Sequence, residues 1–267
     1  QEVYDLGGMK YNSYWGWQDG EKRNSRIKEI EEPIVMLSHY WKINDVSSLN
    51  TNVAYQFGHI GDSRLNYANA SNPDPTYYKN LPSYYLRFQD NLDYASAFLV
   101  GQAFRNDESY SQVNWENLYR TNIENGNTHY YLYEDRVDDK LFTVNSIYKS
   151  YLTDRITLNS GLTYKRLQSE NYANMLDLLG GVNYLDLDYF ASGDAQQNDL
   201  NNPNRQVKVG DKFLYNYEIL SNEINSFLQF QFKFNKVDFY LGTNYISRDY
   251  QRNGLYKNGT YAANSFG

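Results

Sequence analysis

The chain has 267 residues, with 29 tyrosines, 13 phenylalanines, 4 tryptophans and no cysteine, and its formal net charge is −7. This acidic balance argues against the basic groove that nucleic-acid binding requires, and without cysteine the chain has neither disulfides nor thiolate metal sites. No apolar run reaches the roughly 18 residues of a membrane helix. The chain also begins without a recognisable signal peptide, so we expect a mature chain or an internal piece of a longer one.

Aromatic residues make up 17% of a chain whose mean hydropathy is only −0.77. Many rings in a polar chain are typical of aromatic girdles around a wet interior, as in outer-membrane β-barrels. The alternative is a soluble glycan-binding β-protein, in which tyrosine and tryptophan form platforms for sugars. Long strands of alternating polarity joined by short turns favour the barrel.

The first predicted element is a hairpin, Ile34–Ile60, whose turn is Asn44–Ser48. In its second strand Leu49, Thr51, Val53, Tyr55 and Phe57 alternate with polar or small residues and are predicted to face lipid. Its first strand is ambiguous because both faces are apolar. One register directs Val35, Leu37, Trp41 and Ile43 toward lipid, together with His39. The other directs Ile34, Met36 and Tyr40 toward lipid and His39 inward, and we favour the second.

The next segment, Gly61–Leu141, is far longer than a turn. We expect helices in Asp90–Phe104 and Ser111–Tyr119, and we expect Thr128–Asp139 to extend the following strand beyond the bilayer. Three prolines stiffen Asn72–Tyr85. The candidate ligand-binding residues are the aromatic residues of this stiff segment and of the second helix: Tyr77, Tyr78, Tyr84, Tyr85 and Trp115. The alternative is that they brace the loop.

Two further hairpins follow. Phe142–Leu167 turns at Thr153–Arg155, and Ile224–Ser247 turns at Asn235–Lys236. Between them, Gln168–Glu223 is a second long connection, with a predicted helix at Asn171–Leu179 and an exposed tip at Gln196–Arg205. The residues predicted to face lipid are Ile156, Leu158, Leu162, Tyr164, Leu228, Phe230, Phe232 and Leu241. Short turns on one side and long loops on the other are the asymmetry of periplasmic turns and extracellular loops.

The predicted fold is therefore all-β: part of a transmembrane antiparallel β-barrel with long extracellular loops that contain short helices. Six clear strands are too few to close around a lumen, and an open edge in lipid leaves backbone groups unsatisfied. We expect residues 1–267 to be one segment of a larger barrel.

No catalytic motif is present, and we expect neither an enzyme nor a cofactor. The three histidines lack metal-ligand spacing. An acidic cluster in the second long connection could hold calcium, but it lacks the spacing of a calcium loop and reads better as a solvated surface. The histidines are His39, His59 and His129. The acidic cluster consists of Asp177, Asp186, Asp188, Asp194 and Asp199.

Two stretches together resemble a known family. The residues from WGWQDGEKRNS to NVAYQFG (Trp15–Gly58), followed by NPDPTYYKNLPSYY (Asn72–Tyr85), resemble TonB-dependent receptors of Bacteroidetes-type bacteria that carry a carboxypeptidase-regulatory-like domain. The resemblance implies a 22-stranded barrel in the outer membrane of a Gram-negative bacterium, with a plug domain and a TonB box. None of the plug, the TonB box and the N-terminal domain is recognised in this chain.

The predicted function is energised uptake of a solute across the outer membrane. The expected partners are outer-membrane lipid and, from the resemblance, the receptor's own plug and TonB, with a surface lipoprotein or a larger outer-membrane complex as further candidates. An accessory or scaffold barrel in an outer-membrane complex is the second interpretation, and the glycan-binding β-protein is the third.

Overall fold

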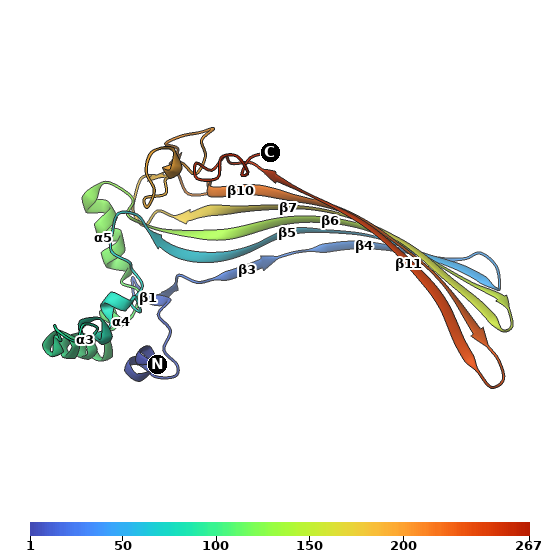
Figure 1. The fold of residues 1–267 in the computed structure, drawn as a ribbon, viewed down its shortest axis with the longest axis horizontal. Coiled ribbons are helices and arrows are strands. Elements are labelled where there is room, and N and C mark those ends of the chain that lie inside the picture. Colours follow the sequence, from blue (N-terminus) through green and yellow to red (C-terminus); the bar gives the residue numbers. More distant parts are fainter.

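A computed structural model describes all residues, Gln1–Gly267. Strands hold 50% of the residues and helices 17%, so the chain is mainly antiparallel β-sheet. Figure 1 shows one long, curved sheet with the helices gathered beyond one of its ends. The main strands are β3 (Lys28–Glu31), β4 (Ile34–Lys42), β5 (Ser47–Tyr67), β6 (Tyr130–Thr153), β7 (Ile156–Asp177), β10 (Lys212–Lys233) and β11 (Asp238–Gly254).

The sheet is a meander in which each long strand pairs with its neighbour along the chain. Its order is β11-β10-β7-β6-β5, and β3 and β4 both pair with β5 in one continuous register. Between β3 and β4 the ladder of backbone hydrogen bonds to β5 is interrupted at Pro33, which has no N–H to donate. The last strand on each side has one unpaired edge, and the sheet does not close into a barrel within these residues.

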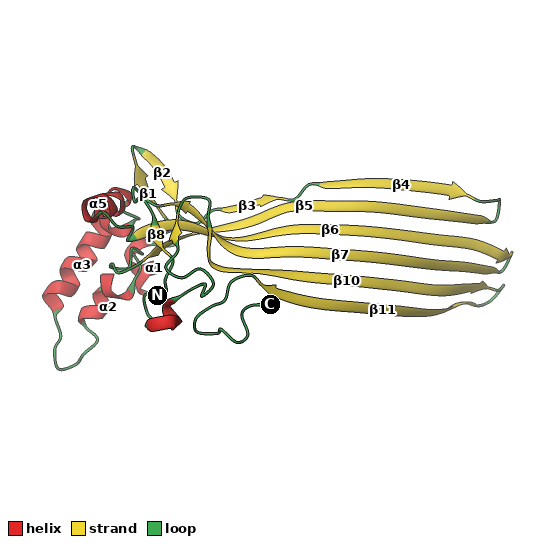
Figure 2. Ribbon diagram, turned by 90° about the horizontal axis from the view of Figure 1, so that it is seen from above, coloured by secondary structure: helices red, strands yellow, loops and turns green.

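The two ends of the sheet differ sharply (Figure 2). At the turn end, short connections after Lys42, Thr153 and Lys233 join β4 to β5, β6 to β7 and β10 to β11, as the three predicted hairpins require. At the loop end, residues 68–129 and 178–211 form the long connections. β6 runs without interruption from Tyr130, which confirms the predicted extension of this strand.

The helices lie at the loop end. They are α1 (Glu2–Gly7), α2 (Pro82–Tyr85), α3 (Tyr94–Asn106), α4 (Glu108–Ser111), α5 (Trp115–Asn125) and the 3₁₀ turns η1 (Tyr78–Asn80) and η2 (Gly193–Gln196). The predicted helix at Asp90–Phe104 corresponds to α3, which begins later because Asp93 caps it by accepting from Ser96 N–H. The helix predicted at Ser111–Tyr119 is divided between α4 and α5. None of the helices has the combined length and apolarity needed to cross a membrane.

The helix predicted at Asn171–Leu179 is wrong, because these residues continue β7 as far as Asp177. Pairing with β6 and β10 overrides the local preference. Asn174 donates from Nδ2 to Glu134 Oε1 at 2.8 Å. Ala173 and Met175 are completely buried. A helix here would give up both the ladder hydrogen bonds and this burial.

Two small antiparallel sheets flank the loop end. They are β1 (Trp15–Gln18) with β2 (Glu21–Asn24), and β8 (Tyr184–Leu185) with β9 (Gln206–Val207). The molecule has two hydrophobic clusters, both at this end of the sheet. One joins α5 to β6 around Trp115, and the other joins β8 and β9 to β6, β7 and β10 around Phe213.

Candidate functional site

The strand register separates the main sheet into two faces of different chemistry. Residues that pair directly across neighbouring strands share a face. One row of the apolar face is Trp41, Leu49, Tyr148, Ser160 and Leu228. One row of the polar face is Ser38, Asn52, Asn145, Thr163 and Asn225. The residues predicted to face lipid on β5, β7, β10 and β11 all fall on the apolar face, so the prediction that they share one face is confirmed.

The favoured register of the first strand is wrong. β4 pairs Trp41 with Leu49 and His39 with Thr51. These pairs place Val35, Leu37, His39 and Trp41 on the apolar face, and Ile34, Met36 and Tyr40 on the polar face. Alternation gave no guidance because both sides of this strand are apolar, and only pairing with β5 fixes the register.

The apolar side chains of this face form a band, and charged residues bound it toward the loop end. The band spans Leu49–Phe57 on β5, Ile156–Tyr164 on β7 and Ile224–Phe232 on β10. Each of these stretches is nine residues long, and alternate residues of it lie on this face. Many are open to the surroundings: Leu37 is 72% exposed and Leu241 is 67% exposed. Beyond Phe57 the same face carries a charged or polar row that crosses five strands, Glu31, His59, Asp138, Glu170 and Glu218.

The limit of the band is oblique to the strands. On β5 the band ends toward the loop end at Phe57, whereas on β11 it ends at Tyr245. Through Ser226, Leu162 and Ser146, Tyr245 lies in the row of Thr51. The limit therefore moves by six residues along the strands over the four steps from β5 to β11.

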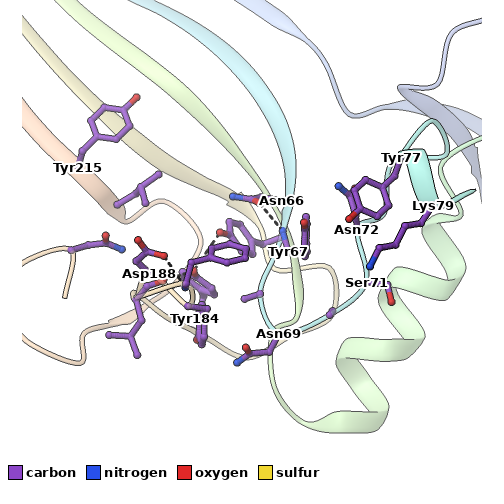
Figure 3. Close-up of a pocket in the computed structure, with 18 of the residues that line it drawn as sticks. Asn66, Tyr67, Asn69, Ser71, Asn72, Tyr77, Lys79, Tyr184, Asp188 and Tyr215 are labelled. Carbon is purple, nitrogen blue, oxygen red and sulfur yellow. Dashed lines mark hydrogen bonds between the residues drawn. The ribbon is translucent and has the colours of Figure 1, made fainter. Parts of the chain in front are cut away.

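The loop end carries a cavity on the polar face. It has a volume of about 1150 Å³, and it lies between the end of β5, the segment after it, β6, the start of β10 and the β8–β9 connection. Its lining includes Asn66 and Tyr131, which pair across β5 and β6 and belong to the polar face. In Figure 3, Asn72, Tyr77 and Lys79 form one wall, and Tyr184 and Asp188 lie across the space from them.

The wall around Tyr184 is held rigidly. The ring of Tyr131 lies 4.4 Å from that of Tyr184, and both pack on the buried Phe213. Tyr131 donates from its hydroxyl to Tyr184 at 3.3 Å, and Tyr215 donates to Asp135 at 2.7 Å. Burial raises the pKa of both Tyr131 and Tyr184, so both hydroxyls stay protonated.

An ion pair anchors the connection behind this wall. Asp186, whose side chain is 2% exposed, accepts hydrogen bonds from Arg205 Nη2 at 2.9 Å and from Asn198 Nδ2 at 2.8 Å. Arg205 also donates to Tyr256 and to the backbone of Lys212. Burial raises the pKa of the Asp186 carboxyl, whereas the hydrogen bond from Asn198 and the charge of Arg205 oppose this rise.

The predicted ligand-binding residues have different positions. Tyr77 lines the cavity. Tyr78, Tyr84 and Tyr85 continue from it as a ladder of rings with centroids 4.7–5.6 Å apart and are not in the lining. Trp115 is completely buried and donates from Nε1 to the backbone oxygen of Arg23 at 3.2 Å. Its ring is covered by neighbouring residues, so we assign it to packing rather than to the site.

The sequence reasoning missed most of the lining. The lining includes Asn66, Tyr184, Phe190, Asn198 and Asn258, none of which is among the candidate residues that the sequence indicates. No local pattern identifies them, because the cavity forms only when five distant segments meet: residues 66–80, 131, 184–198, 214–215 and 258. The acidic residues proposed as a cluster are also separate, since Asp177 pairs with Arg23 and Asp186 with Arg205.

A scan of the sequence against protein-family models and a search of curated proteins found no match.

Proposed function

We propose that the chain is part of the wall of an outer-membrane transport barrel. In this proposal the apolar band contacts lipid, the polar face borders the lumen, and the loop end takes part in solute capture outside the cell. The observation that carries it is the band. Its nine residues per strand agree with the 9–11 residues that a tilted β-strand needs to cross a bilayer. Its aromatic residues lie near both limits, as girdles do: Trp41, Tyr148, Phe232 and Phe239 toward the turns, and Tyr55, Phe57, Phe142 and Tyr164 toward the loops.

The oblique limit of the band supports the same proposal. A shift of six residues is a rise of about 20 Å along a strand, and four strand spacings are about 19 Å. A line that rises about 20 Å along the strands while it crosses about 19 Å of sheet makes an angle of about 45° with the direction perpendicular to the strands. If the limit marks the membrane surface, the strands are tilted by that angle, and strands of outer-membrane barrels tilt by about 35–45°.

The strands also continue well beyond the band. From Phe57 to Asn66, β5 extends for about 30 Å more. The cavity therefore lies above the proposed membrane surface, where a solute from outside would first meet the polar face.

The resemblance to TonB-dependent receptors of Bacteroidetes type supports a particular class of transporter. In that class the barrel would have 22 strands, a plug domain would fill it, and TonB would energise uptake through the plug. The two unpaired edges of the sheet agree with a larger barrel, because further strands would pair with β4 and β11.

A matched pair of substitutions on β10 tests the proposal in the full-length protein. Leu228 lies on the apolar face near the middle of the band, and its neighbour Gln229 lies on the polar face. We expect Leu228→Arg to destabilise the folded barrel by about 2–4 kcal/mol, because the charge would meet hydrocarbon. Gln229→Arg should have little effect. The measurement is heat-modifiable gel mobility of membrane-extracted protein. Equal damage by both variants would contradict a lipid-facing band.

A further inference from the structure

The lining of the cavity is rich in amides and rings and poor in charge. It contains six asparagines, Asn66, Asn69, Asn72, Asn80, Asn198 and Asn258, and its only charged side chains are Lys79 and Asp188. The nearby charges of Asp186 and Arg205 compensate each other. A strongly anionic or cationic ligand would be desolvated here without an opposing net charge, which is costly.

Several of these asparagines present hydrogen-bond donors to the cavity. Asn66 Oδ1 accepts from Tyr67 N–H at 2.8 Å, Asn72 Oδ1 accepts from Asp74 N–H at 2.9 Å, and Asn258 Oδ1 accepts from Thr260 N–H at 3.0 Å. Their Nδ2 groups make no hydrogen bond within the chain. The carbonyl oxygen fixes each side chain, and the free NH₂ group can donate to an oxygen of a ligand.

The aromatic residues of the lining add apolar contact area. Phe190 is 91% exposed and Tyr77 is partly exposed, so at least the ring of Phe190 contributes little to the packing of the chain itself. Phe190 follows a turn in which its N–H donates to Asp188 Oδ1 at 2.9 Å. Exposed rings beside fixed amide donors suit a ligand that has both C–H faces and hydroxyl groups.

We propose that the cavity binds an uncharged, hydroxyl-rich ligand of the oligosaccharide class. This inference rests on the proposed function, because that function turns the polar face and its cavity toward the incoming solute. The volume of about 1150 Å³ exceeds the usual range of sites for small ligands, which favours several sugar units over one.

The experiment is isothermal titration calorimetry of the full-length protein in detergent. The neutral probes are maltohexaose, cellohexaose, xylohexaose, mannohexaose and laminarihexaose. The charged probes are hexagalacturonate, which is anionic, and chitosan hexamer, which is cationic. We expect at least one neutral probe to bind and both charged probes to bind at least about tenfold more weakly, a difference of about 1.4 kcal/mol.

Phe190→Ala tests the assigned cavity. It should weaken binding of the neutral probe at least tenfold, because it removes an exposed ring without disturbing the packing. Tyr94→Ala is the control, since Tyr94 is 67% exposed on α3 and outside the lining. The proposal is overturned if no neutral probe binds, if a charged probe binds as tightly, or if Phe190→Ala binds like the unmodified protein. Calorimetry in detergent does not depend on membrane insertion. A negative result with normal heat-modifiable mobility would therefore reject the ligand class and leave the barrel proposal standing.

Discussion

At the scale of single residues, aromatic side chains of similar appearance in the sequence have different positions. Tyr77 lines the cavity, Tyr78 is 52% exposed in the ladder beside it, and Trp115 is completely buried. The guanidinium of Arg23 lies 4.4 Å from the centre of the Trp115 ring and pairs with Asp177. Residue type and local stiffness identified these rings as candidates, but their surroundings decide which of them a solute can reach.

The Asp186–Arg205 pair provides a prediction at the same scale. In Arg205→Gln the Asp186 carboxylate would remain buried without its cation, so the pKa of this carboxyl would rise further. A carboxyl with a raised pKa in the folded state lowers stability as the pH rises through that pKa. The opening free energy of the 178–211 connection should therefore fall by about 3 kcal/mol at pH 7.5 and recover toward pH 5.

Hydrogen exchange of the Leu214 amide, which donates to Asp186, is the measurement. The double variant Arg205→Gln with Asp186→Asn is the control. It has no charge to titrate, so its protection should vary less with pH. If Arg205→Gln is equally weak at pH 5 and pH 7.5, the carboxylate is not the cause of the loss.

At the scale of elements, α5 and the β8–β9 pair pack on opposite faces of the sheet. α5 packs against Tyr130 and Leu132, which share the side of the apolar face. β8 and β9 pack against Tyr131 and Tyr133, on the polar side. In the proposed barrel, the β8–β9 connection and the segment Asn69–Asn80 would lie over the lumen, and α5 would lie on the outer side of the rim.

Loop-length asymmetry then predicts which segments reach the cell surface. An epitope inserted after Asn201 should be labelled on intact cells, because this residue is exposed at the tip of the 178–211 connection. An epitope after Lys236, in the turn between β10 and β11, should be labelled only after permeabilisation. The reverse pattern would invert the topology and place the cavity on the periplasmic side.

At the scale of the whole molecule, the open edges are the main feature. β4 exposes apolar residues on both faces, with Val35 66% and Met36 67% exposed, and β11 is exposed along nearly its whole length. A long apolar edge with free N–H and C=O groups pairs readily with another strand. The sheet is thus suited to continue on both sides.

Hydrogen exchange of the full-length protein tests this continuation. In an antiparallel edge strand, alternate N–H groups point away from the only neighbour. If further strands pair with both edges, consecutive amides of Ile34–Lys42 and Asp238–Gly254 should all be protected. Amides at the centre of β6, which is paired on both sides, are the reference. Protection of only every second residue would mean that the sheet ends at these strands.

The sequence by itself determined the hairpins, the short turns, the common face of the band and the difference between the two ends. These features are local: alternation with a period of two fixes the face of a strand, and the spacing of the strands shows where the chain turns. The predicted extension of the strand before Phe142 is also present, since β6 begins at Tyr130.

The tertiary structure decided the rest. It set the register of Ile34–Lys42, where both faces are apolar, and it drew Asn171–Asp177 into β7 instead of a helix. It also covered Trp115 and assembled the cavity from segments more than 100 residues apart in the chain, such as Asn66 and Tyr184. In each case the deciding contacts join residues distant in sequence, and their free energy of pairing and burial exceeds the local preference that a single segment carries.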